Sequence, residues 1–476
     1  MSSTQDSSSS ETAAITDPTL FWHQRGLRVQ DNAGLAAAAR DGTVVPVYVY
    51  DPRAFKMVGP RQRAFVLAGV RELKQQYRSL GSDLIVRAGR PSEVLPDLAA
   101  EHGADNIYYN EHYRPARRNS QHRLERETTD CSVASRTDTL LVDPGRLESS
   151  YANHSQFYND WQDVPKRPPF EAPSEDSLAA ISDSKTVPEA ETEIELPAAG
   201  YQAARDRLDA FCADGIFSYN DTRDDLPRAV EAPTQAVSRL SPYLAAEMIG
   251  IREVWAAAND AYGQATGRER KNVDKYRYEL SWREQNYHLL YYNPQLASEN
   301  YKQFPSEIAW RDDDEAFAAW TAGETGYPLV DAGMRQLEQE GYIHNRPRQV
   351  VASFLTKHLL VDWRKGARYF TKQLIDHDHA SNYGNWQWTA STGTDSVDVR
   401  IFDPVSQMSK YDDEAVFVTE YVPELRDVPA RKIVDWPTLS RGERERLAPE
   451  YPHPIVNRND GYERAQRVFE QALGKR

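Results

Sequence analysis

Residues 376–395 read DHDHASNYGNWQWTASTGTD, and no other stretch of the chain is as informative. It holds acidic side chains, two histidines, amides and two tryptophans around a central glycine. Buried acids and amides need hydrogen-bonding partners, and broad aromatic rings beside them form a surface that favours a ligand. The stretch therefore predicts the wall of a binding pocket.

Composition narrows the class of protein. The chain has 476 residues, of which 40% are apolar and 27% are charged, as in a globular protein of two or more domains. Its two cysteines, Cys131 and Cys212, can form neither a disulfide framework nor a cysteine-based zinc site. The N-terminus lacks the apolar core of a secretion signal, and no apolar run is long enough to cross a membrane. We therefore expect a cytoplasmic protein that does not contact membranes.

The charge balance limits how the chain can meet nucleic acid. The net charge is −15, from 57 basic and 72 acidic residues. Such a surface argues against non-specific binding of nucleic acid over the whole protein, but it leaves room for a local basic groove.

The first part of the chain alternates strand-like and helix-like segments. Short apolar or aromatic runs lie at 19–22, 44–50, 83–86 and 106–109, with helical patterns at 33–40, 62–80 and 92–102 between them. The run VVPVYVY is apolar on both faces, as in the centre of a parallel sheet. The alternation predicts a doubly wound, Rossmann-like α/β domain over residues 18–150. No G-x-G-x-x-G follows the first strand, so we expect no standard dinucleotide site there.

The rest of the chain divides at a linker. Residues 1–17 predict a disordered, Ser-rich tail, and residues 151–200 predict a long acidic linker rich in Pro and Ser. From residue 201 to 476 the pattern is almost entirely helical. The predicted fold class is therefore an α/β domain joined by a linker to an all-α domain.

Two further stretches point to chemistry in the helical half. Residues 238–244 read SRLSPYL at a loop-to-helix junction, where free N–H groups and the Arg239 guanidinium suit a phosphate. The alternative is a helix cap with a surface arginine. Residues 278–284 read YELSWRE, and the alternative for Glu279 is a weak surface pair with Arg283 at i+4.

The DHDH sequence raises the question of a metal. Two His and two Asp side chains could supply ligands. However, His377 and His379 lie two residues apart, and on a helix that spacing directs side chains to different faces. We expect no metal at this site.

Together these motifs resemble the DNA photolyase/cryptochrome family. The family pattern at 376–395 is close to D-x-D-x-A-x-N-x-G-x-W-Q-W-x-A-S-T-G-T-D, and its E-L-x-W-R-E matches residues 279–284. The similarity runs from residues 21–28 to residues 422–427 and is densest between residues 327 and 410. The motifs are highly specific for the family and much less specific for its branches, among which the chain resembles the class I-like enzymes that act on cyclobutane pyrimidine dimers. The resemblance implies an α/β antenna domain and a helical domain that binds flavin adenine dinucleotide (FAD).

The resemblance assigns a set of cofactor contacts. They are Tyr219, Val237, Ser238, Arg239, Leu240, Ser241, Arg348, Asp376, Asp378 and Asn382. Arg348 and Asp376 are expected to pair beside the flavin ring, and Asn382 is expected to accept a hydrogen bond from flavin N5–H, which favours reduced flavin and repair. A second, antenna chromophore is expected between the domains. Ala116-Arg117 stands where some folate-binding members carry Asn-Glu, so a deazaflavin is favoured over a folate.

The resemblance also assigns an electron route and a lesion site. Trp386, Trp363 and Trp310 match the family's three-Trp chain to the surface, although any one of them alone would be read as core. Glu279 and Asn382 complete the expected catalytic set. Trp282 and Trp388 are expected to stack on a flipped dimer. The full set expected to contact DNA or the lesion is Arg223, Trp282, Arg283, Asn345, Arg346, Gln349 and Trp388.

Several positions depart from the family pattern. Gln349 stands where repair enzymes carry Met, Gln285 and Asn286 replace two aromatics, Asp403 replaces Asn, and Glu247 replaces a Gly. Amides at the expected lesion wall make it more polar.

Two functions therefore remain open. The first is a light-driven, FAD-dependent DNA repair enzyme, a carbon–carbon lyase that acts as a monomer on damaged DNA. It would split cyclobutane pyrimidine dimers by electron transfer from excited reduced flavin, and Asn382 favours this reading. The second is a cryptochrome-like blue-light photoreceptor with weak or no repair, which four of the departures, Gln349, Gln285, Asn286 and Asp403, favour. A third reading, a flavoprotein oxidoreductase working in the dark, lacks a nicotinamide motif.

Overall fold

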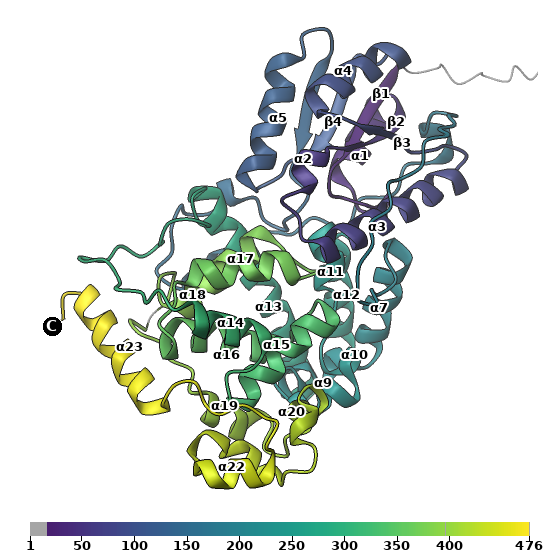
Figure 1. Cartoon of the computed structure of the whole chain (residues 1–476). Helices are drawn as coiled ribbons and strands as arrows, with labels where there is room; N and C mark the ends of the chain where they lie inside the picture. Colours follow the sequence, from purple (N-terminus) through teal and green to yellow (C-terminus); the bar gives the residue numbers. More distant parts are fainter. Residues whose placement is uncertain (1–16, 396, 476) are drawn as a thin grey trace, which may run out of the picture.

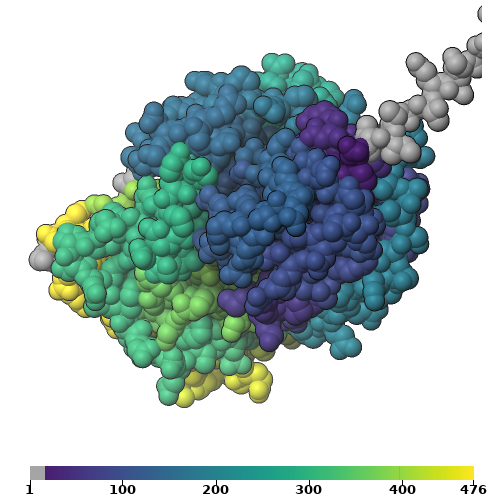
Figure 2. Space-filling view, turned by 90° about the horizontal axis from the view of Figure 1, so that it is seen from above, coloured from purple at the N-terminus to yellow at the C-terminus, as the bar shows by residue number. Residues whose placement is uncertain are grey.

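The computed structural model describes residues 17–395 and 397–475, arranged as an α/β domain against a larger helical domain (Figure 1). Residues 1–16 of the predicted tail lie outside the described residues. Seen from above, the α/β domain, in purple and blue, lies against the helical domain in green (Figure 2). In the part of the chain that the structure describes, no helix has the length and apolar character needed to span a bilayer.

A five-stranded parallel sheet forms the centre of the α/β domain. Its order is β3-β2-β1-β4-β5, with β1 at Pro18–His23, β2 at Thr43–Tyr50, β3 at Ile85–Ala88, β4 at Asn106–Asn110 and β5 at Ser132–Arg136. β1 and β2 are buried along almost their full length, as the apolar run at 44–50 predicts. The four predicted strands are present. β5 escapes prediction because its sequence, SVASR, is polar and partly exposed at the sheet edge.

Helices cover the sheet on both sides. They are α1 at Ala33–Asp41, α2 at Pro52–Phe55, α3 at Pro60–Ser79, α4 at Pro91–His102 and α5 at Pro115–Glu127. Asn32 caps α1 by accepting a hydrogen bond from the Leu35 amide, and proline in the first turn starts α3, α4 and α5. The strand order reverses between β1 and β4, which creates a crevice at their carboxyl ends.

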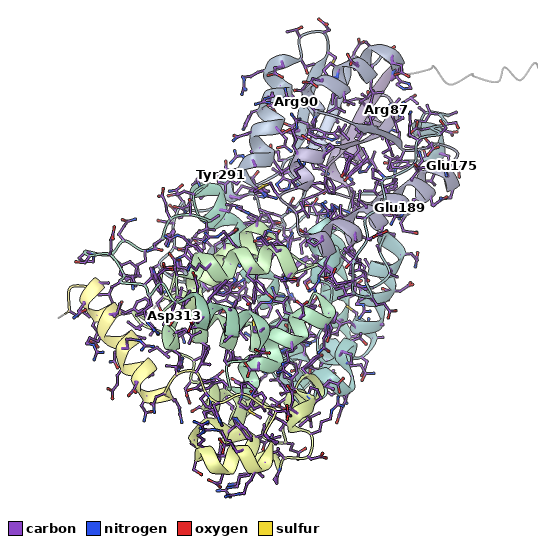
Figure 3. All side chains as sticks on the ribbon, in the orientation of Figure 1. Arg87, Arg90, Glu175, Glu189, Tyr291 and Asp313 are labelled. Carbon is purple, nitrogen blue, oxygen red and sulfur yellow. The ribbon has the colours of Figure 1, made fainter. Side chains whose placement is uncertain are left out.

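The segment 151–200, predicted as a linker, packs against the rest of the protein at several points. It contains helix α6 at His154–Asp163, whose Phe157 and Trp161 are fully buried. Further on, the Ala179 amide donates to the Val44 carbonyl at 2.8 Å, and Asp183 pairs with Arg87 at 2.9 Å. Glu175 and Glu189 mark the path of the segment along the outer side of the α/β domain (Figure 3).

The helical domain is built around α13, a 26-residue helix at Gly267–Tyr292. α13 contacts α6, α8, α12 and α18. The helices are α7 at Tyr201–Ala213, α8 at Tyr219–Thr222, α9 at Leu226–Glu231, α10 at Pro233–Ala236, α11 at Ser241–Ala246, α12 at Ile251–Gln264, α14 at Asp314–Ala322, α15 at Pro328–Glu340, α16 at Asn345–Ser353, α17 at Trp363–Gln373, α18 at His379–Ala390, α19 at Pro404–Tyr411, α20 at Val416–Tyr421, α21 at Ala430–Val434, α22 at Arg441–Leu447 and α23 at Arg458–Ala472. A π-helical turn, η4 at Phe354–His358, follows α16.

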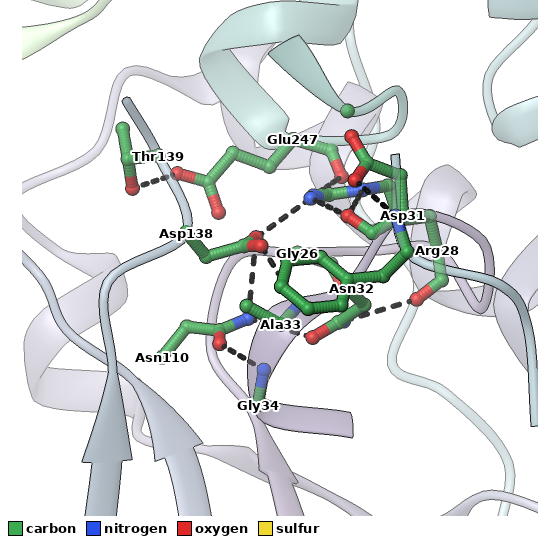
Figure 4. A network of polar contacts seen from close by, with 12 residues as sticks. Gly26, Arg28, Asp31, Asn32, Ala33, Gly34, Asn110, Asp138, Thr139 and Glu247 are labelled. Atoms are coloured by element: carbon green, nitrogen blue, oxygen red, sulfur yellow. Dashed lines mark hydrogen bonds and ion pairs between the residues drawn. The ribbon is translucent and has the colours of Figure 1, made fainter. Parts of the chain in front are cut away.

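Two arginines and two aspartates, almost fully buried, join the domains. Figure 4 shows three of the four, Arg28, Asp31 and Asp138. Arg28 Nη2 lies 2.6 Å from Asp138 Oδ2. Arg252 of α12 reaches Asp31 Oδ1 at 2.6 Å through Nε and Asp138 Oδ1 at 2.5 Å through Nη2. Burial alone would raise the pKa of Asp138, but Arg28 and Arg252 outweigh it and hold that pKa below its usual value. We call these four residues the Arg–Asp cluster.

Contacts around the cluster also explain why Glu247 can stand where the family pattern has Gly. This residue ends α11 in the left-handed conformation, at φ 53°, which a glycine adopts more easily. Its carbonyl accepts a hydrogen bond from Arg28 Nη1 at 3.0 Å, and its carboxylate accepts one from the Thr139 hydroxyl at 2.7 Å. Contacts with the α/β domain therefore hold the glutamate in place.

We predict that Asp138→Asn lowers the free energy of unfolding by roughly 3–5 kcal/mol at neutral pH, because it leaves buried guanidinium charge without its partner. Urea denaturation measures this loss. The difference from the wild type should shrink as pH falls below about 4, where the carboxyl of the unfolded chain begins to protonate, and should be lost once pH also passes the lower native pKa of Asp138.

The matched control is Glu445→Gln, which breaks the exposed Arg441–Glu445 pair at 2.8 Å. It should change stability by less than about 0.5 kcal/mol. Equal effects of the two substitutions would show that the cluster does not hold the domains together.

Candidate functional site

One cavity in the helical domain collects the predicted cofactor contacts. Its lining includes Tyr219, Val237, Ser238, Arg239, Leu240, Ser241, Arg348, Asp376 and Asp378, which is every predicted contact except Asn382. Asn382 lines an adjoining cavity with Trp386, Trp388 and Gln349. The two cavities share Arg348 and Asn345 in their walls. We call the first the cofactor cavity.

Asp376 ties the parts of this cavity together. Its carboxylate accepts a hydrogen bond from the Ser241 hydroxyl at 2.7 Å and lies 3.1 Å from Arg348 Nη2. The Arg348–Asp376 pair predicted from the sequence is therefore present. Through Asp376, the start of α11 and the middle of α16 are fixed to the stretch that precedes α18.

Arg239 lies differently from the way the phosphate argument supposes. Its backbone borders the cavity in the left-handed conformation, at φ 51°. Its guanidinium, however, lies 2.7 Å from Glu340 and stacks over the Tyr342 ring at 4.0 Å. An anion in this cavity would therefore meet backbone N–H groups and the hydroxyl of Ser238, because the Arg239 charge is already paired.

Asp378 stands between the helical and α/β domains. It caps α18 by accepting a hydrogen bond from the Ser381 amide at 2.9 Å, and it also accepts one from the Tyr287 hydroxyl. Arg25 Nη2 lies 3.4 Å away. Burial raises its pKa, but Arg25 and Arg283 outweigh burial and lower the pKa to about 2, so the side chain is ionised.

Asn382 is oriented by its amide nitrogen. Nδ2 donates to the Ala367 carbonyl at 3.1 Å and lies 3.4 Å from the Thr371 hydroxyl. This assignment follows from the hydrogen-bond network. It leaves the amide oxygen of Asn382 free to accept a hydrogen bond from a group in the adjoining cavity, which Asn382 lines, as its predicted role requires.

Two of the three predicted tryptophans, Trp386 and Trp363, lie along α17, and Trp310 lies beside the segment that leads into this helix. Trp386 rests on Gly366, where an added Cβ would come within 2.3 Å of the ring. Trp363 is fully buried at the start of α17 and donates to Asn300 Oδ1 at 3.0 Å. Trp310 is half-buried, and its neighbour Arg311 donates from its amide to the Leu360 carbonyl at 2.7 Å. Burial thus decreases from Trp386 and Trp363 to Trp310.

A further cavity adjoins the cofactor cavity and collects the predicted lesion contacts except Arg346. Its lining includes Arg223, Glu279, Trp282, Arg283, Asn345, Gln349 and Trp388. The rings of Trp282 and Trp388 lie 6.3 Å apart at 74°. Tyr219, Val237 and Asn345 line both this cavity and the cofactor cavity. We call it the lesion cavity.

The charged residues of the lesion cavity are paired with one another. Glu279 binds Arg223 and lies 2.7 Å from Lys275 Nζ. Arg283, which would pair with Glu279 in the alternative interpretation of the sequence, instead donates to the Thr139 carbonyl at 2.9 Å. The surface-pair reading of Glu279 with Arg283 is therefore wrong.

Arg346 lies beside this cavity and is also paired. Its Nη2 is 2.7 Å from Asp224, and its Nη1 donates to Gln349 Oε1 at 2.8 Å. Arg223 and Arg346, both in the set predicted to contact DNA or the lesion, thus have acidic partners in this structure.

The departures from the family pattern fall into two groups. Asn286 and Gln349 line the lesion cavity, so they change its wall. Gln285 is buried, and its amide has no partner among the described residues. Asp403 forms a two-point pair with Arg458, at 2.5 Å and 2.6 Å, which accounts for an acid there.

Some lining residues escape prediction from the sequence. Lys275 and Tyr278 of α13, and Ser381 and Asn385 of α18, line the lesion cavity. Helical spacing could have found them, because Lys275, Tyr278 and Asn385 lie three or four positions from Glu279, Trp282 and Trp388, and Ser381 lies seven positions, or two turns, before Trp388. Trp320 is also unforeseen: it is fully buried, with its ring 6.2 Å from that of Trp386.

Another cavity lies between the domains, at the carboxyl ends of β1 and β4. Its lining includes Gln24 and Arg25 after β1, His112, Arg114 and Arg117 after β4, and His377, Asp378 and His379. Burial lowers the pKa of Arg114 and of Arg117, and it lowers the pKa of His377 to about 3. Among the described residues, no group of His, Cys, Asp or Glu side chains could hold a metal ion.

Comparison with known proteins agrees with this geometry. Residues 19–174 match the family described as DNA photolyase, and residues 276–471 match the FAD binding domain of DNA photolyase. A Halobacterium salinarum protein named deoxyribodipyrimidine photo-lyase is 44% identical over 483 residues, covering 96% of this chain and 99% of that protein.

Solved structures show the same fold. A bacterial class III photolyase from Agrobacterium tumefaciens has a TM-score of 0.86 at 32% identity, covering 98% of this chain and 100% of that one. An archaeal photolyase from Sulfolobus tokodaii with two FAD molecules has a TM-score of 0.80 at 32% identity, covering 95% of this chain and 100% of that one. Matched in both domains and over nearly its whole length, the chain belongs to the DNA photolyase family.

Proposed function

We propose that this protein is a light-driven, FAD-dependent enzyme that splits cyclobutane pyrimidine dimers in DNA. The observation that carries the proposal is the shared wall of two cavities, one with the cofactor contacts and one with Glu279, Trp282 and Trp388. Bound FAD, in its reduced and light-excited form, supplies the electron that opens the cyclobutane ring. The chain itself must hold the cofactor, present the lesion and return the flavin to its reduced form.

The residues of the cofactor cavity fit FAD. Backbone N–H groups and hydroxyls at residues 238–241 can bind a diphosphate. The Arg348–Asp376 pair is placed to meet the polar edge of a flavin, and the free oxygen of Asn382 can accept a hydrogen bond from its N5–H. Holding that proton favours the reduced cofactor.

The residues of the lesion cavity fit a flipped dimer. Trp282 and Trp388 offer flat rings on which extruded bases can stack, at roughly 1–3 kcal/mol per base. Glu279 is near its cationic partners Arg223 and Lys275. DNA phosphates would compete for those cations, and the released carboxyl group would then be available to the polar edge of the dimer.

The direct test uses purified reduced protein and an oligonucleotide that contains one dimer. Blue light should remove the dimer, and darkness should not. Dimers that persist under light, with FAD bound and DNA present, would refute the proposed reaction.

We predict that Glu279→Gln lowers dimer splitting per bound lesion by roughly tenfold or more, because a charge-assisted hydrogen bond to the lesion is lost. Single-turnover repair assays measure this. Asp221→Asn is the matched control, since Asp221 pairs with Arg268, which is 78% exposed, on the same face of the domain. A full-rate Glu279→Gln enzyme would remove Glu279 from the catalytic set.

We predict that Trp386→Phe slows photoreduction of the bound flavin on the order of tenfold or more, since phenylalanine is much harder to oxidise and each 1.4 kcal/mol of barrier is a factor of ten. Flavin content should stay close to that of the wild type. Transient absorption after a light flash measures the rate. Trp320→Phe is the control, because the Trp320 ring lies 6.2 Å from that of Trp386 but Trp320 is not one of the three predicted tryptophans. An equal loss in the control would mean that electrons leave by way of Trp320.

The cryptochrome-like function has less support from the structure than from the sequence. Of its four substitutions, Asp403 is accounted for by Arg458, and Gln285 does not line the lesion cavity. Only Asn286 and Gln349 alter the wall, and amides can hydrogen-bond the polar edge of a pyrimidine. We therefore favour repair.

We also propose that the cavity between the domains holds an antenna chromophore. Arg114 and Arg117 make no ion pair with an acid within residues 17–395 and 397–475, so they favour a ligand with negative charge. We favour a deazaflavin over a folate, because Ala116-Arg117 stands where some folate-binding members carry Asn-Glu. The absorption spectrum of chromophores released by denaturation distinguishes a deazaflavin, a second flavin and a folate, and release of the active-site FAD alone would remove this assignment.

The partner of the enzyme is damaged DNA, and we propose that it binds as a monomer in the cytoplasm. The free thiols Cys131 and Cys212 fit a reducing compartment.

A further inference from the structure

An imidazole ring lies flat against the back of Trp282. His154, the first residue of α6, stacks on the indole with ring centroids 3.8 Å apart and planes 7° apart. His154 is 4% exposed, whereas Trp282 is half-buried at the lesion cavity. Tyr158, one turn further along α6, lies parallel to the imidazole at 6.1 Å. The three rings form a column that ends at the cavity.

A hydrogen bond sets the orientation of the imidazole. The Ser281 hydroxyl donates to the Tyr278 carbonyl at 2.7 Å, so its oxygen is left to accept from His154 Nε2 at 3.0 Å. His154 therefore carries its proton on Nε2. Its Nδ1 has no partner among the described residues. Burial lowers the pKa of His154 to about 3, so the stacked ring is neutral.

This column leaves Trp282 one usable face. One side of the indole is covered by His154, and Trp388 stands edge-on at 6.3 Å on the cavity side. A base can therefore stack only on the cavity side of Trp282. The plane of that face is determined by the imidazole behind it, because aromatic pairs have preferred geometries.

We propose that His154 is a positioning residue for lesion recognition: it holds the plane of Trp282 so that a flipped dimer meets a fixed surface. The inference rests on the proposed function. It gives α6, which lies in the segment predicted as a linker, a part in the lesion site. His154 does not touch the lesion, so its effect must pass through Trp282.

Two substitutions separate stacking from space filling. His154→Leu keeps most of the volume but removes the flat ring, and His154→Phe keeps the flat ring but removes the hydrogen bond to Ser281. Proteins labelled with 5-fluorotryptophan report the state of each indole by fluorine NMR, and the Trp282 line is identified by its loss in Trp282→Phe. We expect the Trp282 line to shift and broaden in His154→Leu and to stay sharp in His154→Phe.

Binding to DNA gives the second measurement. In His154→Leu the Kd for an oligonucleotide with one dimer should rise roughly two- to tenfold, the range expected for one lost aromatic pair. The Kd for undamaged DNA, the FAD content and the photoreduction rate should not change, and His154→Phe should recover the affinity. This pattern is not expected from a general loss of folding.

The outcomes of these experiments distinguish the positioning role of His154 from the proposed repair function. An unchanged fluorine line, or an unchanged Kd for the dimer in His154→Leu, would overturn the positioning role while repair by the wild type still stood. A wild-type protein that binds dimer-containing and undamaged DNA equally would overturn the proposed function, and the lesion role of His154 with it.

Discussion

The Arg–Asp cluster is the constraint on which the two-domain arrangement depends. Buried charges are costly unless every one is paired, so Arg28, Asp31, Asp138 and Arg252 must stay together. Three of them come from the α/β domain and one from α12. The pairing fixes the domains relative to each other, and with them the cavity between the domains and the turn at Glu247. Because Arg252 pairs with both Asp31 and Asp138, a small shift of either domain would break more than one ion pair at once.

A second polar chain runs from this boundary to the chemistry. Arg25 pairs with Asp378, Asp378 caps α18, and α18 carries Asn382, Trp386 and Trp388. Two positions earlier, Asp376 fixes Arg348 and Ser241. Residues 376–388 thus position side chains of the cofactor cavity, the first predicted tryptophan of the electron route and one wall of the lesion cavity. This explains why so many polar residues are concentrated in it, since each must find a partner once buried.

Much of this could be predicted from the sequence, and the gaps have physical causes. Strands β1 to β4 are apolar and are recognised by pattern, whereas β5 is polar and α6 is hidden in a Pro- and acid-rich segment, although Phe157 and Trp161 have helical spacing. The cofactor residues follow from motifs. The direction of the Arg239 side chain does not, because it depends on Glu340, 101 positions away in the chain. Likewise, the partners of Glu279 come from the residue that follows α8 and from the preceding turn of α13, and only tertiary packing brings Arg223 there.

Asp378 lines both the cofactor cavity and the cavity between the domains. Its ion pair with Arg25 therefore belongs to two chambers at once. A ligand that fills the outer chamber would strip water from this pair and strengthen the electric field that the pair exerts on whatever lies in the inner one. The absorption spectrum and the reduction potential of the pigment in the inner chamber would then depend on whether the outer chamber is occupied. Substitutions that adapt either chamber to a new pigment would have to be compatible with both pigments.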